Sequence, residues 1–171
     1  IKSDGTERPA MKWLRQYLTS KNSFRSASSG NWEDLNTWEE YDGTTWIKPA
    51  TKFPDAFGDL IIIQNGHTIT LNSKDSVDQI SIAQGGKLII AKGAELKIKD
   101  GNGVDLSVGG IIENYGTIKQ DSTATISFQD GSKYYHKQDG GEIPISLWAS
   151  GSTIEFDSIK TVSPKNANQN F

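Results

Sequence analysis

The chain alternates hydrophobic and polar residues in short segments between Asp59 and Phe156. In most segments two apolar residues flank one polar residue, as in Ile80-Ser81-Ile82. This period of two predicts β-strands with one buried face and one solvent-exposed face. Gly, Asn and Asp separate the segments and predict tight turns. The apolar positions are Ile80 and Ile82, Leu88 and Ile90, Leu96 and Ile98, Leu106 and Val108, Ile118, and Ile126 and Phe128.

Two architectures use short strands of this kind. One is an antiparallel sandwich, and the other is a parallel β-helix whose stacked coils each contribute two or three strands. Short strands of near-equal length at intervals of 8 to 12 residues favour the β-helix, because stacked coils would align Ile, Leu and Val in continuous ladders. Each coil would take about 20 to 30 residues, giving roughly four or five coils. We therefore predict an all-β chain folded as a right-handed parallel β-helix.

The residues before Asp59 follow a different pattern. Residues 6–17 show helical spacing, with Pro9 in the first turn and Met11 and Leu14 on one face. A segment rich in Ser and Asn follows, and then an aromatic segment. The sequence therefore predicts a short helical extension in residues 1–25 and a Trp-rich cap in residues 26–58. The β-helix itself is expected in residues 59–171 and is predicted to continue beyond them.

Composition narrows the classes of function. The 171 residues include 18 Lys and Arg and 21 Asp and Glu, for a net charge of -3, which gives no electrostatic reason to expect nucleic acid as a partner. No apolar run approaches the length of a membrane span. The absence of Cys excludes disulfides and thiolate metal centres. Phosphate-binding glycine motifs are also absent, and we predict no cofactor.

Several stretches carry a resemblance to a known family. They are the segments SGNW at 29–32, TW at 37–38, DLIIIQNGHTITL at 59–71, YH at 135–136, DGGEIP at 139–144 and WASGSTIE at 148–155. Together they resemble the β-helical, G8-like domains of large secreted cell-surface proteins of Bacteroidota. The resemblance covers residues 26–171, and none of its motifs is catalytic.

This resemblance implies a location and partners. Proteins of this kind are similar to substrates of the type IX secretion system, which are exported across the outer membrane and often kept at the cell surface, some of them as adhesins. The resemblance therefore implies an extracellular protein on the cell surface. It implies the type IX machinery as a partner during export, and surface glycans or other cell-surface proteins as further partners.

Three sites resemble the O-glycosylation motif of the same phylum, in which Asp precedes Ser or Thr and an apolar residue. The serines concerned are Ser76, Ser122 and Ser158; Thr123 is the third residue of the second motif. Asp-Ser pairs are also ordinary turn residues. The sequence leaves both interpretations open.

Catalytic and metal-binding roles receive less support. The candidates are Asp100, Asp105, Asp121, Asp130, His67 and His136. Most of these aspartates adjoin Gly or Ser, which is the placement that turns require. The oxygen-rich run at residues 100–105 has Val104 where a calcium loop needs an oxygen ligand. We predict no catalytic residue and no metal site.

The tryptophans Trp32, Trp38 and Trp46 allow two interpretations. Exposed indoles would stack on sugars, whereas buried ones would cover the open end of the β-helix; their position ahead of the coils favours the cap. The sequence thus predicts a noncatalytic structural or adhesin-like β-helix domain of a larger secreted cell-surface protein. The alternative is the β-helix or carbohydrate-binding part of a secreted polysaccharide-degrading enzyme.

Overall fold

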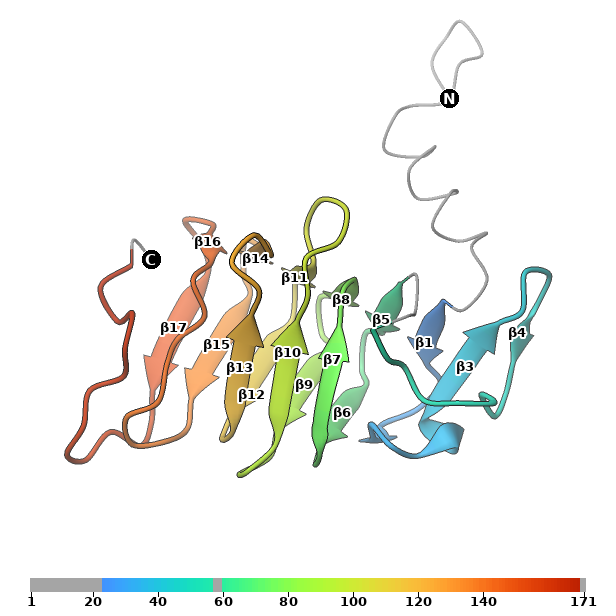
Figure 1. Ribbon diagram of the computed structural model, residues 1–171, viewed down its shortest axis with the longest axis horizontal. Coiled ribbons are helices and arrows are strands. Elements are labelled where there is room, and N and C mark those ends of the chain that lie inside the picture. Colours follow the sequence, from blue (N-terminus) through green and yellow to red (C-terminus); the bar gives the residue numbers. More distant parts are fainter. Residues whose placement is uncertain (1–22, 57–59, 170–171) are drawn as a thin grey trace, which may run out of the picture.

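The computed structural model describes residues 23–56 and 60–169. The chain winds through three sheets that run along a common axis (Figure 1), and three successive coils each add one strand to every sheet. Sheet A contains β1 (Phe24–Ser26), β5 (Ile61–Ile63), β8 (Ile80–Ile82), β11 (Leu106–Val108), β14 (Ile126–Phe128) and β16 (Leu147–Trp148), with β3 (Trp38–Tyr41) and β4 (Trp46–Ile47) beyond β1. Sheet B contains β2 (Gly30–Asn31), β6 (Thr68–Leu71), β9 (Lys87–Ile90), β12 (Ile111–Asn114), β15 (Lys133–His136) and β17 (Thr153–Phe156). Sheet C contains β7 (Lys74–Val77), β10 (Glu95–Ile98) and β13 (Thr117–Gln120).

Strands from successive coils run parallel and in register. In sheet A, Ile80 is the Cα partner of both Ile61 and Leu106, and Leu106 is also the partner of Ile126. This arrangement confirms the predicted parallel β-helix, which makes about five turns, and it contradicts the antiparallel sandwich. Its handedness stays a prediction.

Aliphatic ladders fill the interior. Ile61, Ile80, Leu106 and Ile126 form one such ladder and are at most 2% exposed. Burying a side chain of this size contributes about 1.5–3 kcal/mol, so the ladders are the main stabilising element. The polar residues between them face outward, as the period of two predicts.

Two glycines allow the coils to approach one another at the corners. A Cβ atom at Gly110 would lie 2.2 Å from the carbonyl oxygen of Gly86, and one at Gly116 would lie 2.4 Å from that of Ala94. Both neighbours are backbone atoms of the preceding coil and cannot move away independently. Glycine is therefore required at these corners by close stacking.

The Trp-rich segment extends sheet A. Strand β3 pairs antiparallel with β1, and β4 pairs antiparallel with β3, so the two strands lie beyond the parallel ladder (Figure 1). Strand β1 itself pairs parallel with β5, so the parallel ladder already begins at Phe24. A capping role for residues 26–58 stays a prediction.

Helical structure is sparse in the part of the chain that the structure describes. The structure shows a 3-10 helix, η1 (Leu35–Thr37), between β2 and β3. The helix predicted for residues 6–17 lies outside the described residues. Within residues 23–56 and 60–169, no helix has the length and apolar character needed to cross a membrane.

Ion pairs join neighbouring coils on the outer surface. Lys87 Nζ lies 2.8 Å from Glu113 Oε1 on sheet B, and Lys119 Nζ lies 2.7 Å from Glu95 Oε2 on sheet C. Each pair links a strand to its neighbour in the next coil. These surface contacts add side-chain links along the axis to the backbone hydrogen bonds.

Candidate functional site

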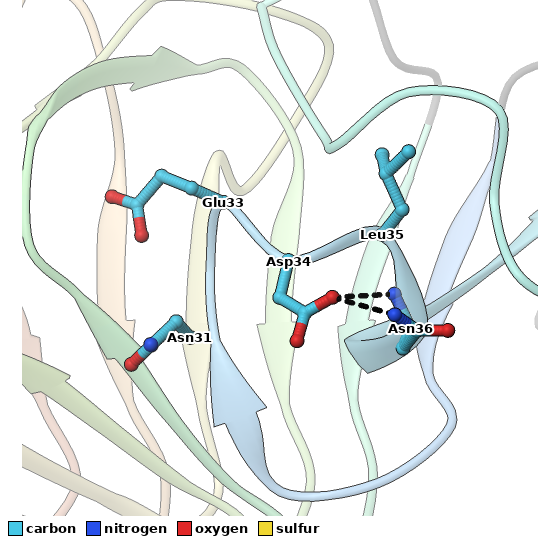
Figure 2. A pocket seen from close by; sticks show the side chains of 5 residues that line it. All are labelled: Asn31, Glu33, Asp34, Leu35 and Asn36. Carbon is cyan, nitrogen blue, oxygen red and sulfur yellow. Dashed lines mark hydrogen bonds between the residues drawn. The ribbon is translucent and has the colours of Figure 1, made fainter.

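A shallow cavity opens at the N-terminal end of the β-helix, where β2 leads into η1. Its volume is about 490 Å³, and its lining residues are Asn31, Glu33, Asp34, Leu35 and Asn36, as Figure 2 shows. Strand β2 pairs with β6, and this pairing with the next coil positions the residues that line the cavity.

Asp34 serves the local structure of the cavity wall. Its Oδ1 accepts a hydrogen bond from the backbone N–H of Asn36 at 2.9 Å and another from Asn36 Nδ2 at 3.0 Å (Figure 2). Asp is a preferred residue before a helix because its carboxylate satisfies an amide without an intrahelical partner. Capping of η1 therefore explains the presence of an aspartate at position 34.

Glu33 is held by the loop between β6 and β7. Its Oε1 accepts hydrogen bonds from the hydroxyl of Ser73 at 2.7 Å and from the backbone N–H of Asn72 at 3.1 Å. Partial burial acts to raise the pKa of Glu33, but these hydrogen bonds outweigh it and leave the pKa below its ordinary value. Glu33 is therefore kept ionised.

Asp75 occupies an inward position on β7. It is the Cα partner of the buried Leu96, and its carboxylate accepts a hydrogen bond from the Ser76 backbone N–H at 2.7 Å. Burial raises the pKa of Asp75 above its ordinary value, outweighing the hydrogen bonds from Ser76 and Trp32, and the charges of Asp55 and Glu33 raise it further. Asp75 thus holds a proton more readily than a surface aspartate.

The carboxyl groups of Glu33 and Asp75 therefore have pKa values displaced in opposite directions. Opposed shifts of this kind are shared by acid and base pairs in glycosidases, and they also arise wherever one carboxylate is hydrogen-bonded and another is buried. Among the described residues, no group of three or more His, Cys, Asp or Glu side chains is placed to hold a metal ion.

The predicted tryptophans occupy different environments. Trp32 and Trp38 are fully buried, with ring centroids 5.1 Å apart. The Trp32 Nε1–H donates to the carbonyl of Pro54, and that of Trp38 donates to the carbonyl of Trp32. Trp46 is half-buried, and the Arg25 guanidinium lies 4.3 Å from its ring centroid. Trp32 and Trp38 therefore present no face on which a sugar could stack.

The three serines proposed for glycosylation lie apart from one another. Ser76 is on β7 and is half-buried, Ser122 is exposed in the turn after β13, and Ser158 is half-buried after β17. Strand β10 separates β7 from β13 in sheet C. Ser122 is the most accessible of the three to a modifying enzyme, and it also lines a groove that includes Gln120 and Leu147.

The aspartates considered for catalysis have structural partners. Asp105 is fully buried, and its two oxygens accept hydrogen bonds from the backbone N–H groups of Gly101 and Thr125 at 2.8 and 2.7 Å. Asp121 pairs with Lys97 at 2.8 Å, and the hydrogen bond from Lys97 lowers the pKa of Asp121. Asp130 lies against Gly151 of the next coil. Asp100 lies in the exposed loop after β10.

The histidines also have structural contacts. His67 Nδ1 lies 2.8 Å from the hydroxyl of the buried Ser26, which joins two coils. His136 is fully buried and points inward from β15. Its Nε2–H donates to the carbonyl of Gly140 at 2.7 Å, while its Nδ1 has no hydrogen-bond partner among the described residues. The structure brings neither histidine together with the four candidate aspartates.

Sequence reasoning missed Glu33 and Asp75. Glu33 lies in the aromatic segment, which has no regular period, so its position next to the β6–β7 loop could not be foreseen. Asp75 did carry a signal, because it stands two residues before the buried Val77 on one strand. A charged residue at an inward position indicates a special environment.

Comparison with known proteins gives no relatives for this chain. No protein family, curated protein or solved structure matches it at a significant level.

Proposed function

We propose that this chain is a noncatalytic structural, adhesin-like domain of a larger secreted bacterial cell-surface protein. The observation that supports the proposal is the in-register parallel stack of strands along one axis. Each strand is paired on both sides except at the ends of a sheet, so the hydrogen bonds run along the axis and resist its bending. A stack of this kind holds whatever its loops and ends carry at a fixed distance.

The finer parts of the proposal follow the resemblance to surface proteins of Bacteroidota. They are export by the type IX secretion system, location at the cell surface, and contact with surface glycans or other cell-surface proteins. They also include a right-handed coil, a cap formed by the Trp-rich segment, and a helical extension before it. Glycans on Ser122, and on Ser76 and Ser158 when accessible, would project from the outer surface of the coils.

A mechanical experiment tests the structural role. The chain is held between handles at its two ends and stretched in a single-molecule force instrument. A rod built from stacked coils should stay at constant length up to a defined force and then lengthen in steps that match whole coils. Gradual extension at low force would contradict the proposal.

Secretion and modification are tested in the native host. An antibody raised against this chain should detect the parent protein on intact cells, and disruption of the type IX system should move the signal inside. Intact-mass analysis of the native protein should show added sugar mass, which should decrease when Ser122 is changed to Ala. Unchanged location in the disrupted strain, or an unmodified mass, would remove the corresponding part of the proposal.

The second candidate function is part of a polysaccharide-degrading enzyme. Glu33 lines the surface cavity, and the charge interaction between Glu33 and Asp75 together with their opposed pKa displacements favours this candidate over other catalytic classes. It predicts release of reducing sugar from a soluble polysaccharide and its loss in both Glu33→Gln and Asp75→Asn. Glu155→Gln, on the exposed part of β17, is the matched control. No release by the unaltered chain from xylan, pectin or β-glucan would dismiss this candidate and leave the structural role.

A further inference from the structure

Two Asn-Gly pairs lie in turns of the β-helix. Asn65-Gly66 lies between β5 and β6, and Asn102-Gly103 lies between β10 and β11. We infer that Asn102 is a site of spontaneous deamidation in the folded protein, whereas Asn65 is protected by the coil stack. This inference concerns the chemistry of one loop and does not depend on the proposed function.

Deamidation is an intramolecular reaction that needs no cofactor. The backbone nitrogen of the following residue loses its proton and attacks the side-chain carbonyl carbon of Asn, ammonia leaves, and a cyclic succinimide forms. Water then opens the ring at either carbonyl and yields Asp or isoaspartate. A following Gly favours the attack because it has no Cβ and leaves the backbone free to rotate.

The stacked turns hold Asn65 and Gly66 in an unreactive arrangement. The backbone N–H of Gly66 donates a hydrogen bond to the carbonyl of Gly85 in the next coil at 3.0 Å. The side chain of Asn65 also lies against that turn, since a Cβ atom at Gly85 would be only 2.4 Å from Asn65 Oδ1. Attack would require the Gly66 hydrogen bond to break and the Asn65 side chain to leave its contact.

The loop around Asn102 is more open. It projects from the coils between β10 and β11 (Figure 1), and residues 101–104 are all exposed. In the described part of the chain, no backbone hydrogen bond is found for the Gly103 N–H. The attacking nitrogen is thus accessible at Gly103 and bonded at Gly66.

The ends of this loop are nevertheless anchored. Gln79 Nε2 donates to the carbonyl of Asn102 at 2.8 Å, and the buried Asp105 carboxylate accepts from the N–H groups of Gly101 and Thr125. The chemical change should therefore stay within the loop and leave the coils intact. It would place a new negative charge next to the coil surface and, in the isoaspartate product, shift the contact with Gln79.

Peptide mapping by mass spectrometry tests the inference. The folded chain is incubated in weakly alkaline buffer, sampled over several weeks and digested with trypsin, which places Asn65 and Asn102 in different peptides. We expect Asn102 to convert about tenfold faster than Asn65. Attack at Asn65 must first break the hydrogen bond of the Gly66 N–H, and the net free energy of one hydrogen bond corresponds to a rate factor of about that size. Asn102→Gln should abolish the faster phase, and Asn65→Gln should leave it unchanged.

Unfolded protein provides the internal control. In concentrated urea both Asn-Gly pairs lose their structural context, and their rates should become similar. Equal rates in the folded chain would overturn the inference. Folded Asn102 that stays intact while the unfolded chain converts would also overturn it.

Discussion

The coils between Leu60 and Gln120 are built differently from those that follow. In the first part, most inward positions are aliphatic and the third side of each coil is a strand of sheet C. In the second part, the inward positions hold Phe128, Tyr134, His136 and Trp148, and sheet C gains no strand beyond β13 among the described residues. The chain thus follows the same coiled path around a mainly aliphatic interior in the first part and a largely aromatic interior in the second.

Aromatic packing replaces the aliphatic ladder in the second part. The rings of Phe128 and Trp148 are stacked with centroids 4.1 Å apart and planes inclined by 9°, and Tyr134 meets Phe128 edge-on at 5.8 Å. These rings fill more of the cross-section than Ile or Leu does. A regular third strand is absent from these coils in the described residues. Residues 139–143 and 160–165 are joined there by backbone hydrogen bonds and side-chain hydrogen bonds.

Asp139 is a closing group of the second part, because it joins the segment after β15 to the segment after β17. Its carboxylate accepts hydrogen bonds from the backbone N–H groups of Lys160, Thr161 and Val162 and from the Thr161 hydroxyl. The hydrogen bond from the Thr161 hydroxyl and those from the three amides hold the pKa of Asp139 well below its ordinary value. The second part therefore depends on the ionised Asp139 side chain in addition to apolar burial and strand pairing.

The largest expected effect comes from truncating the aliphatic ladder. Leu106→Ala leaves a cavity between buried neighbours and should lower the free energy of unfolding by about 2–5 kcal/mol. Leu147, in the second part, is 64% exposed, and Leu147→Ala should change that free energy by less than about 0.5 kcal/mol. Urea denaturation followed by circular dichroism measures both. Equal losses would contradict the stabilising role of the buried aliphatic ladder.

Tyr134→Phe tests a buried hydrogen bond within the aromatic interior of the second part. The Tyr134 hydroxyl accepts a hydrogen bond from Asn114 Nδ2 at 2.9 Å, so its removal leaves a buried donor unpaired and should cost about 1–3 kcal/mol. Burial raises the pKa of Tyr134 from 10.0 to about 12. The contribution of the neutral Tyr134 side chain to the free energy of unfolding is therefore full below pH 10.0 and is lost as the pH rises towards 12. The difference in the free energy of unfolding between wild type and variant, measured by urea denaturation, should shrink over that interval. A difference that does not change with pH would contradict the burial of the Tyr134 hydroxyl.

Asp139→Asn tests the closing group. A neutral amide cannot replace the ionised acceptor, so residues 160–162 should exchange their amide hydrogens faster while the amides of β8 and β11 stay protected. Because the pKa of Asp139 is lowered by folding, its contribution is full above the ordinary value of 3.8 and is lost as the pH falls below it. Wild-type protein should therefore lose protection at 160–162 at acidic pH. Hydrogen exchange read by mass spectrometry shows both effects, and uniform loss of protection would contradict a local role.

The ion pairs between coils should matter least. Lys87→Gln removes the contact with Glu113 and should lower the free energy of unfolding by about 0.2–1 kcal/mol, less at high salt. Lys133→Gln, in the same row of sheet B, is the control, and it should have a smaller effect. A larger loss at Lys87 than at Leu106 would mean that surface charge pairs, and not buried aliphatic ladders, dominate the stability of the coils.

The strands with two aliphatic inward residues could be predicted from the sequence. The pairs at Ile80 and Ile82 and at Leu106 and Val108 coincide with β8 and β11, because a period of two with a buried face has no other simple interpretation. The choice of stacked coils over a sandwich also succeeded, since strands of near-equal length suit coils that repeat.

Strands β12 and β15, which lack an inward aliphatic pair, escaped the pattern. β12 places Ile112 and Asn114 inward, and β15 places Tyr134 and His136 inward, so neither shows the aliphatic pair. The interaction between the charges of Glu33 and Asp75 depends on how two neighbouring coils stack, which local periodicity does not encode. The burial of Trp32 and Trp38 is likewise decided by tertiary packing.

The parallel, in-register stack is tested most directly by nuclear Overhauser effects between backbone protons of β8, β11 and β14. The structure predicts contacts that link Ile80 with Leu106, Ser81 with Ser107, and Val108 with Phe128. Contacts in the reversed order, linking Ile80 with Val108 and Ile82 with Leu106, would show antiparallel neighbours and contradict the β-helix.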